Sequence, residues 1–191
     1  MARFDHFDLI APHYERFFHA IPDESFFELV AAQTGMLILD VAGGTGRVAQ
    51  HLTAVGANAV ITDISVPMLR QSMQKKAIFP AQTLAERLPF ADNVFSRVVM
   101  VDALHHVIHQ GETIREMLRV LQPGGRLIIE EPDIRNFYVK LIALGEKLLM
   151  MRSHFLTGEQ ISDLFLPLTK SISVKHSGHT VWVVVEKQLA E

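Results

Sequence analysis

Short apolar runs without polar alternation recur along the middle of the chain, and segments with helical spacing separate them. Such runs are typical of strands that are buried on both faces of a parallel sheet. Five of them follow one another, the third being weaker because Pro80 interrupts it: 36–39, 59–61, 78–84, 94–101 and 126–130. Strands that alternate with helices of about three turns predict a doubly wound α/β sheet.

The segments between these strands carry apolar residues at helical spacing. Val48, Leu52 and Val55 predict one helix, and residues 67–77 predict a second one that has a proline in its first turn. The third begins before Ile114 and repeats its apolar positions at i+3, i+4 and i+7, so that one face is apolar. We expect Pro123-Gly124-Gly125 to end that helix.

The two ends of the chain have patterns of their own. Apolar residues between Ile10 and Ile21 follow one helical face, and Asp23 is a candidate N-cap for a second short helix. An apolar helix is expected over 136–151, and Thr157 and Gln160 have the spacing of a capping box. Apolar runs at 172–174 and 181–185 flank Ser177-Gly178-His179 and predict a hairpin. The complete prediction is a Rossmann-like, seven-stranded, mostly parallel sheet that a C-terminal antiparallel hairpin closes.

Composition limits the classes of function. A length of 191 residues predicts one domain, and 49% hydrophobic residues supply a large core. The net charge of −3 argues against nucleic acid as the main partner, and the absence of cysteine excludes thiolate metal sites and cysteine nucleophiles. No uncharged apolar run reaches the roughly 18 residues of a membrane span. The first residues lack an apolar signal core, so we expect a cytoplasmic protein.

A glycine-rich loop (DVAGGTGRVA, residues 40–49) follows the first predicted strand. Glycines at this place let a ligand approach the backbone at a helix N-terminus, where free N–H groups favour an anion. Gly44, Gly46 and Ala49 match the dinucleotide fingerprint, and Asp63 lies near the distance at which an acid would hold a ribose. The glycines alone leave a dinucleotide site, another nucleotide site and a plain tight turn open.

The residues around the loop carry a family resemblance. Asp40 and the glycine loop end the first strand, and Asp63 ends the second. The further motifs are AERLPF at 85–90, LHHV at 104–107, LQPGG at 121–125 and an upstream aromatic segment from Phe7 to Tyr14. In this order, over residues 5–132, they resemble class I S-adenosylmethionine-dependent methyltransferases. The resemblance is closest to the branch of the ubiquinone/menaquinone biosynthesis C-methyltransferases.

The resemblance implies S-adenosyl-L-methionine as the cofactor, S-adenosyl-L-homocysteine as its product, and a set of binding residues. Asp40 and the glycines would lie at the methionine end, Asp63 would bind the ribose hydroxyls, and Ile64 and Met68 would pack on the adenine. Tyr14 would belong to a lid, and Asp102 would lie near the methionine end or the acceptor. The complete set is Tyr14, Asp40, Val41, Ala42, Gly43, Gly44, Gly46, Asp63, Ile64, Met68, Leu84, Ala85, Glu86 and Asp102.

One position departs from the family pattern, and the catalytic group is open. Many relatives carry an aspartate where this chain has Leu84, so a side-chain contact to the adenine amino group is missing. The Ala85 backbone and Glu86 lie next to that position. His105 and His106 are the candidate bases, because histidine titrates near neutral pH and the pair follows a strand end. Their alternative is a structural role. No metal site is expected.

Along the chain we expect lid helices at 1–33, the cofactor-binding core at 34–131, a helical acceptor-site insertion at 132–170 and the closing hairpin at 171–187. The predicted reaction is methyl transfer to a small apolar or aromatic molecule by in-line displacement, which needs mainly orientation and a dry pocket. The apolar helix at 136–151 would cover that acceptor or form a homodimer contact, and its basic residues would suit an acid-bearing substrate. Two alternatives are a methyltransferase-fold protein that binds the cofactor without catalysis and a nicotinamide-dependent oxidoreductase.

Overall fold

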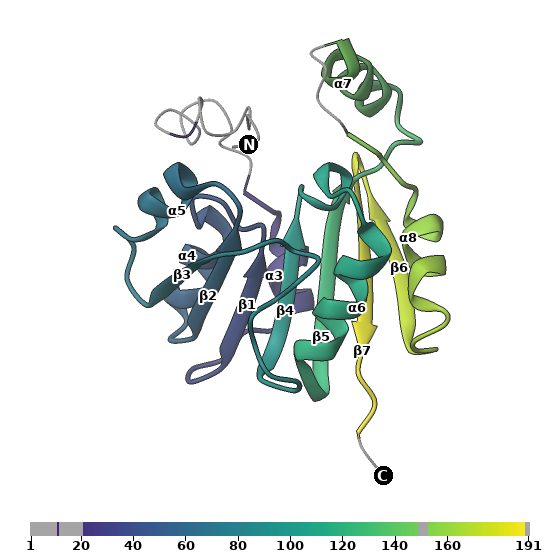
Figure 1. Ribbon diagram of the computed structural model, residues 1–191. Helices are drawn as coiled ribbons and strands as arrows, with labels where there is room; N and C mark the ends of the chain where they lie inside the picture. The colour runs from purple at the N-terminus through teal and green to yellow at the C-terminus, as the bar shows by residue number, and fades with distance from the viewer. Residues whose placement is uncertain (1–10, 12–20, 149–152, 190–191) are drawn as a thin grey trace.

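The computed structural model describes residue 11 and residues 21–148 and 153–189. Seven strands form one sheet in the order β3-β2-β1-β4-β5-β7-β6 (Figure 1). The strands are β1 Leu37–Val41, β2 Asn58–Asp63, β3 Ile78–Gln82, β4 Phe95–Val101, β5 Leu121–Pro132, β6 Ile172–Ser177 and β7 Thr180–Glu186. The helices are α3 Glu24–Val30, α4 Arg47–Ala54, α5 Val66–Ser72, α6 Gln110–Val120, α7 Phe137–Leu148 and α8 Gly158–Phe165, with a 3-10 turn η2 at Leu104–His106.

Strand direction confirms the predicted fold class. The pairs from β3 to β5 are all parallel, whereas β7 runs antiparallel to β5 and β6 runs antiparallel to β7. The hairpin β6–β7 therefore closes the sheet at the side of β5. Its connection is only Gly178-His179, since β6 continues to Ser177. Gly178 has a φ of +57°, a conformation that glycine adopts without a steric penalty.

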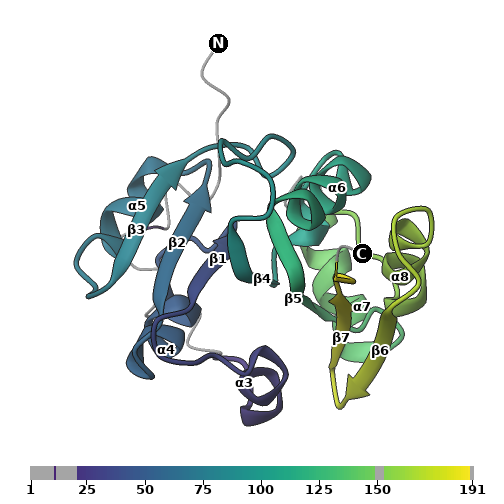
Figure 2. The same ribbon diagram turned by 90° about the horizontal axis from the view of Figure 1, so that it is seen from below.

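Helices cover both faces of the sheet, with α3 and α4 on one side and α6 and α8 on the other (Figure 2). Consecutive strand residues point to opposite faces. In β1, Ile38 belongs to the apolar cluster of Phe26 and Leu52, from α3 and α4. Its neighbour Leu39 belongs to the cluster of Met117 and Phe165, from α6 and α8. Burial on both faces explains why the strand sequences are continuously apolar.

Two helix ends differ from the prediction. The helix predicted over 67–77 ends at Ser72, whose hydroxyl donates to the Leu69 carbonyl and competes with the helical backbone pattern. The predicted stop at Pro123-Gly124-Gly125 is wrong, because α6 ends at Val120 and β5 begins at Leu121. Phe95 of β4 pairs with Leu121, and the Gly124 N–H donates to the Lys187 carbonyl. The glycine-rich segment is thus an irregular first part of the strand.

Helix caps and the edge strand follow the sequence closely. The Asp23 side chain accepts from the Phe26 N–H at the start of α3, and Thr157 and Gln160 form both bonds of the capping box that opens α8. Pro80 lies in β3, which pairs with β2 alone, so the missing N–H faces the free edge. The first predicted helix, between residues 10 and 21, lies outside the described residues except at its ends.

Candidate functional site

A cavity of about 190 Å³ opens at the carboxyl ends of β1, β2 and β4. In an open α/β sheet this edge is where ligands bind, and in Figure 1 it is the upper edge of the sheet. Its walls come from the glycine loop, the residues after β2, the segment after β3 and the turn after β4. The residues include Asp40, Ala42, Gly43, Thr45, Arg47, Thr62, Asp63, Ile64, Met68, Leu84, Ala85, Glu86, Asp102 and His106.

The glycine loop leaves no room for larger residues. A Cβ atom built on Gly43 would lie 2.6 Å from Cγ of Asp40 and 2.9 Å from Cγ2 of Ile61. Gly46 is the N-cap of α4 and has a φ of +77°, and a Cβ on it would lie 2.7 Å from Cδ1 of Ile61. The loop is therefore packed tightly onto the strand ends, and its backbone lies at the cavity wall.

The Asp63 carboxylate fastens this loop to the end of β2. Its Oδ2 accepts from the Gly44 N–H at 3.0 Å, and its Oδ1 accepts from the Ser65 N–H at 2.8 Å. Asp63 also lines the cavity, and a carboxylate oxygen can accept more than one hydrogen bond. The carboxylate thus orders the loop and lies where a ligand hydroxyl group could reach it.

Buried polar atoms without partners gather around the cavity. Within the described residues, five buried side-chain atoms have no hydrogen bond, and four of them belong to residues of the cavity wall: Asp40, Thr45, Arg47 and Thr62. Such atoms are rare in folded proteins, because each one loses its contact with water without compensation. Their concentration at one place indicates that a polar ligand supplies the missing partners.

Asp40 is the acid among these four residues, and the pKa of its carboxyl is strongly shifted. Its side chain is 1% exposed, and burial raises the pKa of its carboxyl to about 7, although the nearby Arg47 guanidinium lowers the pKa. Asp63 adds a smaller upward contribution to the pKa. A cationic ligand group beside Asp40 would favour the ionised carboxylate, since an opposite charge lowers the pKa of an acid.

Arg47 connects the glycine loop with the turn after β4. Its Nη2 lies 3.2 Å from Oδ2 of Asp102, which has a φ of +51°. Burial raises the pKa of Asp102, and the negative charge of Glu131 adds to this shift. The pair places a guanidinium between Asp40 and Asp102 at the base of the cavity.

The opposite wall of the cavity is apolar and open to solvent. Met68 is buried, whereas Ile64 and Leu84 are 51% and 56% exposed and border the cavity mouth. Glu86 also lines the cavity and accepts from the His109 N–H at 3.4 Å. A flat heterocycle would find apolar surface here, with backbone and carboxylate groups at its edge.

The structure brings most of the predicted binding residues to this cavity. Ten of them line it: Asp40, Ala42, Gly43, Asp63, Ile64, Met68, Leu84, Ala85, Glu86 and Asp102. Val41, Gly44 and Gly46 are not part of the wall, although Gly44 bonds to Asp63 and Gly46 caps the helix behind it. Tyr14 lies outside the described residues. The binding roles themselves remain predictions.

The two candidate histidines occupy different environments. His106 lines the cavity, and burial together with the neighbouring His105 lowers its pKa to about 3. His105 is buried behind the wall, where its Nδ1 lies 2.5 Å from Oε2 of Glu131 and its ring stacks on Phe155. His106 is thus a weak base and His105 is part of a buried pair.

Glu131 is a functional candidate that the sequence prediction did not include. Its Oε1 accepts from the N–H groups of Ala103 and Leu104, at 2.9 and 2.7 Å, while Oε2 contacts His105. One carboxylate therefore fixes the turn that carries Asp102 and His106. The signal was available, because Glu130 and Glu131 end the fifth predicted strand just as Asp40 and Asp63 end the first and second.

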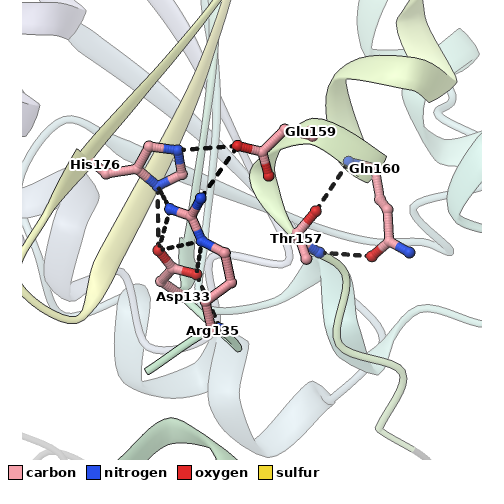
Figure 3. Close-up of polar contacts among 6 residues, drawn as sticks. All are labelled: Asp133, Arg135, Thr157, Glu159, Gln160 and His176. Carbon is pink, nitrogen blue, oxygen red and sulfur yellow. Dashed lines mark hydrogen bonds and ion pairs between the residues drawn. The ribbon is translucent and has the colours of Figure 1, made fainter. Parts of the chain in front are cut away.

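A polar cluster holds the segment after β5 against the hairpin and α8 (Figure 3). Arg135 binds Asp133 through Nε and Nη2, and its Nη1 lies 3.3 Å from Oε1 of Glu159. Nδ1 of His176 lies 2.6 Å from Nη2 of Arg135, and Nε2 lies 3.3 Å from Oε1 of Glu159. The same Nδ1 also lies 3.1 Å from Oδ2 of Asp133, so that it has a donor and an acceptor as neighbours.

Within the described residues, no group of three or more His, Cys, Asp or Glu side chains is placed to hold a metal ion. No helix in the same residues is long and apolar enough to cross a membrane.

Comparison with known proteins agrees with this arrangement. A family model described as a methyltransferase domain matches residues 39–129. The chain is 40% identical over 114 residues to the ubiquinone/menaquinone biosynthesis C-methyltransferase UbiE of Pseudomonas paraeruginosa, which covers 54% of this chain and 44% of that protein. It is 33% identical over 172 residues to the protein of the same name from Stutzerimonas stutzeri, covering 83% of this chain and 66% of the relative.

The chain therefore spans about half to two thirds of the length of these curated relatives. Among solved structures, an S-adenosylmethionine-dependent methyltransferase from Thermotoga maritima has a TM-score of 0.78 at 22% identity. The match covers 95% of this chain and 98% of that one. At 22% identity, this similarity shows that the two proteins share a fold.

Proposed function

Since the chain belongs to the S-adenosylmethionine-dependent methyltransferase family, we propose that it transfers a methyl group from S-adenosyl-L-methionine to a small apolar or aromatic molecule. The observation that carries this proposal is the cavity at the strand ends, whose wall residues include four buried polar atoms without a hydrogen-bond partner. The family implies the cofactor, and the cavity offers a polar site in which it could bind.

The residues present suit this cofactor. Asp40 and Asp102 offer negative charge to the cationic methionine end, where Asp40 has a buried oxygen without a partner. Asp63 offers carboxylate oxygens to the ribose hydroxyls, and Ile64, Met68 and Leu84 offer apolar surface to the adenine. When bound, the cofactor supplies a methyl group on a sulfonium leaving group. The chain has to bind it, orient it and keep water away.

We propose that all of these segments serve one methyltransferase domain, in which residues 34–131 bind the cofactor and residues 132–170 build the acceptor side. Support comes from α7, which follows β5 and stands beyond the carboxyl end of that strand (Figure 1). Val139 is buried, whereas Phe137, Tyr138, Leu141 and Leu144 of the same helix are more than half exposed. We propose that this helix covers the acceptor.

A homodimer contact through the same exposed face is the competing use of α7. Light scattering of the wild-type chain and of Leu141→Glu separates the two uses. A monomeric wild type excludes the dimer contact. If the wild type is a dimer and Leu141→Glu dissociates it, the exposed face of α7 is a dimer contact and does not cover the acceptor.

Calorimetric titration tests the proposed function directly. We expect S-adenosylmethionine and S-adenosylhomocysteine to bind, and NADH to give no heat. Binding of S-adenosylhomocysteine alone would favour the non-catalytic alternative, and binding of NADH alone would favour an oxidoreductase. Neither alternative has support from the comparisons.

Asp63→Ala tests the proposed ribose contact in the same calorimetric titration. Removing the carboxylate deletes charge-assisted hydrogen bonds, each worth about 1.5–3 kcal/mol, so we expect the Kd of S-adenosylhomocysteine to rise at least about tenfold. Asp63→Asn is the matched variant, since it keeps one acceptor oxygen and should give an intermediate Kd. Wild-type affinity in Asp63→Ala would show that the ribose assignment is wrong.

A further inference from the structure

A second cavity, of about 320 Å³, lies beside the first at the ends of β5 and β7. It is lined by Ile21, Pro22, Asp23, Asp102, Glu130, Pro132, Val139, His179, Thr180 and Trp182. Asp102 belongs to the walls of both cavities, so the two spaces meet at that carboxylate. A molecule in the second cavity would therefore lie next to the cofactor site.

Glu130 is the acid at the centre of this cavity wall. Its side chain is 6% exposed, and its Oε2 accepts from the indole Nε1–H of Trp182 at 2.5 Å. Within the described residues, no hydrogen bond reaches Oε1. Burial raises the pKa of Glu130 to about 7, and the charges of Asp102 and Asp23 contribute in the same direction. Arg47 and the Trp182 bond act against this shift.

The charges around the second cavity limit which molecules it can bind. Three carboxylates line it, from Asp23, Asp102 and Glu130, and His179 is the one described lining residue that can carry a positive charge. An acceptor with a carboxylate or phosphate would be repelled. A molecule that donates a hydrogen bond fits better, with its apolar part among Ile21, Pro22, Pro132 and Val139.

The other candidate bases are less suited to take a proton here. His105 is held by Glu131 and lines neither cavity, and the low pKa of His106 keeps that ring neutral. Asp102 is paired with Arg47. Glu130 combines burial, an oxygen without a described partner and a position on the wall.

We propose that Glu130 is the catalytic residue that accepts the proton of the methyl acceptor, an uncharged molecule with a dissociable hydroxyl proton that occupies the second cavity against Trp182. This inference rests on the proposed function. The acceptor O–H bond breaks, the proton passes to Oε1 of Glu130, and the electron pair stays on the acceptor as an oxyanion. That electron-rich form is what an electrophilic methyl group requires. Glu130 later returns its proton to water and becomes a carboxylate again.

Trp182 supplies a readout that does not depend on methyl transfer. It is the single tryptophan of the chain, so the emission comes from one site, where the indole contacts Glu130. We expect the emission of the wild type to change with a midpoint near pH 7. Glu130→Gln should abolish this transition, whereas Glu112→Gln, a change in an exposed acid of α6 that lines neither cavity, should retain it.

The probe for proton transfer is 3-nitrophenol, whose absorbance changes when the hydroxyl proton is lost, and 3-nitroanisole is the same ring without that proton. At about pH 7 we expect 3-nitrophenol to quench Trp182 and to show the phenolate band in the wild type and in Glu112→Gln. Glu130→Gln should lose the phenolate band. Trp182→Phe removes the one described donor to Glu130, so the bound probe should show at least as much phenolate.

Three results would overturn the proposal: a phenolate band of equal strength in Glu130→Gln, equal quenching by the two probes without such a band, or no quenching of the wild type at all. Calorimetry with S-adenosylhomocysteine on the same samples separates the causes. If that ligand binds and the probes fail, the role of Glu130 is wrong while the proposed function stands. Absence of S-adenosylhomocysteine binding would refute the proposed function, whatever the probes show. Retained binding in Glu130→Gln also shows that the variant is folded.

Discussion

At the scale of single residues, Gly43 is the position of the glycine loop with the least room for an added side chain. An added Cβ would fall 2.6–2.7 Å from the Asp40 carboxyl and 2.9 Å from Ile61. We expect Gly43→Ala to lower the free energy of unfolding by about 1–3 kcal/mol, because neither neighbour has space to move. It should also weaken S-adenosylhomocysteine binding in calorimetry.

Gly111→Ala is the matched control for that substitution. Gly111 lies in α6 with nothing within 4 Å of an added Cβ. Alanine favours a helix over glycine by about 1 kcal/mol, so this variant should be as stable as the wild type or more stable. A stable Gly43→Ala with full ligand affinity would contradict the close packing of the loop.

Asp40 predicts how stability depends on pH. The pKa of Asp40 is about 7 in the folded protein and has its usual value of 3.8 in the unfolded chain, so between these pH values the native protein holds a proton that the unfolded chain has lost. The free energy of unfolding should therefore fall as the pH rises from about 4 to about 7, by up to about 1.4 kcal/mol per pH unit. Asp40→Asn removes the contribution of Asp40 to this pH dependence. The free energy of unfolding of Asp40→Asn, relative to that of the wild type, should therefore increase as the pH rises over the same range. Urea unfolding would measure it.

The same variant should weaken ligand binding, because it removes the negative charge from the proposed methionine end. A stability difference between Asp40→Asn and the wild type that does not change with pH would show that Asp40 is ionised in the folded state throughout. Glu130 contributes a similar pH dependence in both proteins, so the difference between them isolates Asp40.

At the scale of elements, the strands were predictable and some of their ends were not. Continuous apolar runs identified β1, β2 and β4 because both faces of these strands are buried. The start of β5 was missed, because Pro123-Gly124-Gly125 is a local stop signal for a helix. The pairing of Leu121 with Phe95 and of Gly124 with Lys187 extends the strand through it. These partners are distant in sequence, and local patterns contain no information about them.

The cluster of Asp133, Arg135, Glu159 and His176 holds the segment after β5 against α8 and β6, and it gives an element-scale prediction. Hydrogen bonds from Arg135 lower the pKa of Asp133. A depressed pKa stabilises the native state above the usual value of 3.8, and this contribution disappears as the pH falls through the folded value. Arg135→Ala should lower the thermal midpoint by a few degrees at neutral pH, with a smaller deficit in strong acid.

Lys140→Ala serves as the control for Arg135→Ala. Lys140 is an exposed cation on the adjoining helix α7 and forms no ion pair with any described residue. Its removal should leave the midpoint unchanged at both pH values. Equal effects of the two substitutions would mean that general charge, and not the cluster, causes the change.

At the scale of the whole molecule, parallel strands explain why the first cavity was largely predictable and the second was not. Asp40 and Asp63 lie at the carboxyl ends of parallel strands and Asp102 directly follows a third, so their meeting at one edge of the sheet follows from the strand pattern. The second cavity needs Trp182 to lie opposite Glu130 across the antiparallel pair β5–β7, with Asp23 brought in from before α3. The register of that pair and the path of the chain before α3 have no local signature.

Ligand binding should stabilise the whole fold, because the residues that line the first cavity lie between Asp40 and Ile108 and come from four parts of the sheet. At a concentration of about 100 times Kd, a ligand that binds only the native state adds about 2.7 kcal/mol. For a chain of this size, that corresponds to a rise in the thermal midpoint of about 5–10 °C. S-adenosylhomocysteine should produce this rise in a thermal-shift experiment, and NADH at the same concentration should not. Asp63→Ala should reduce the rise, whereas Gly111→Ala should retain it. An equal rise with NADH, or none with S-adenosylhomocysteine, would contradict the assignment of the cavity.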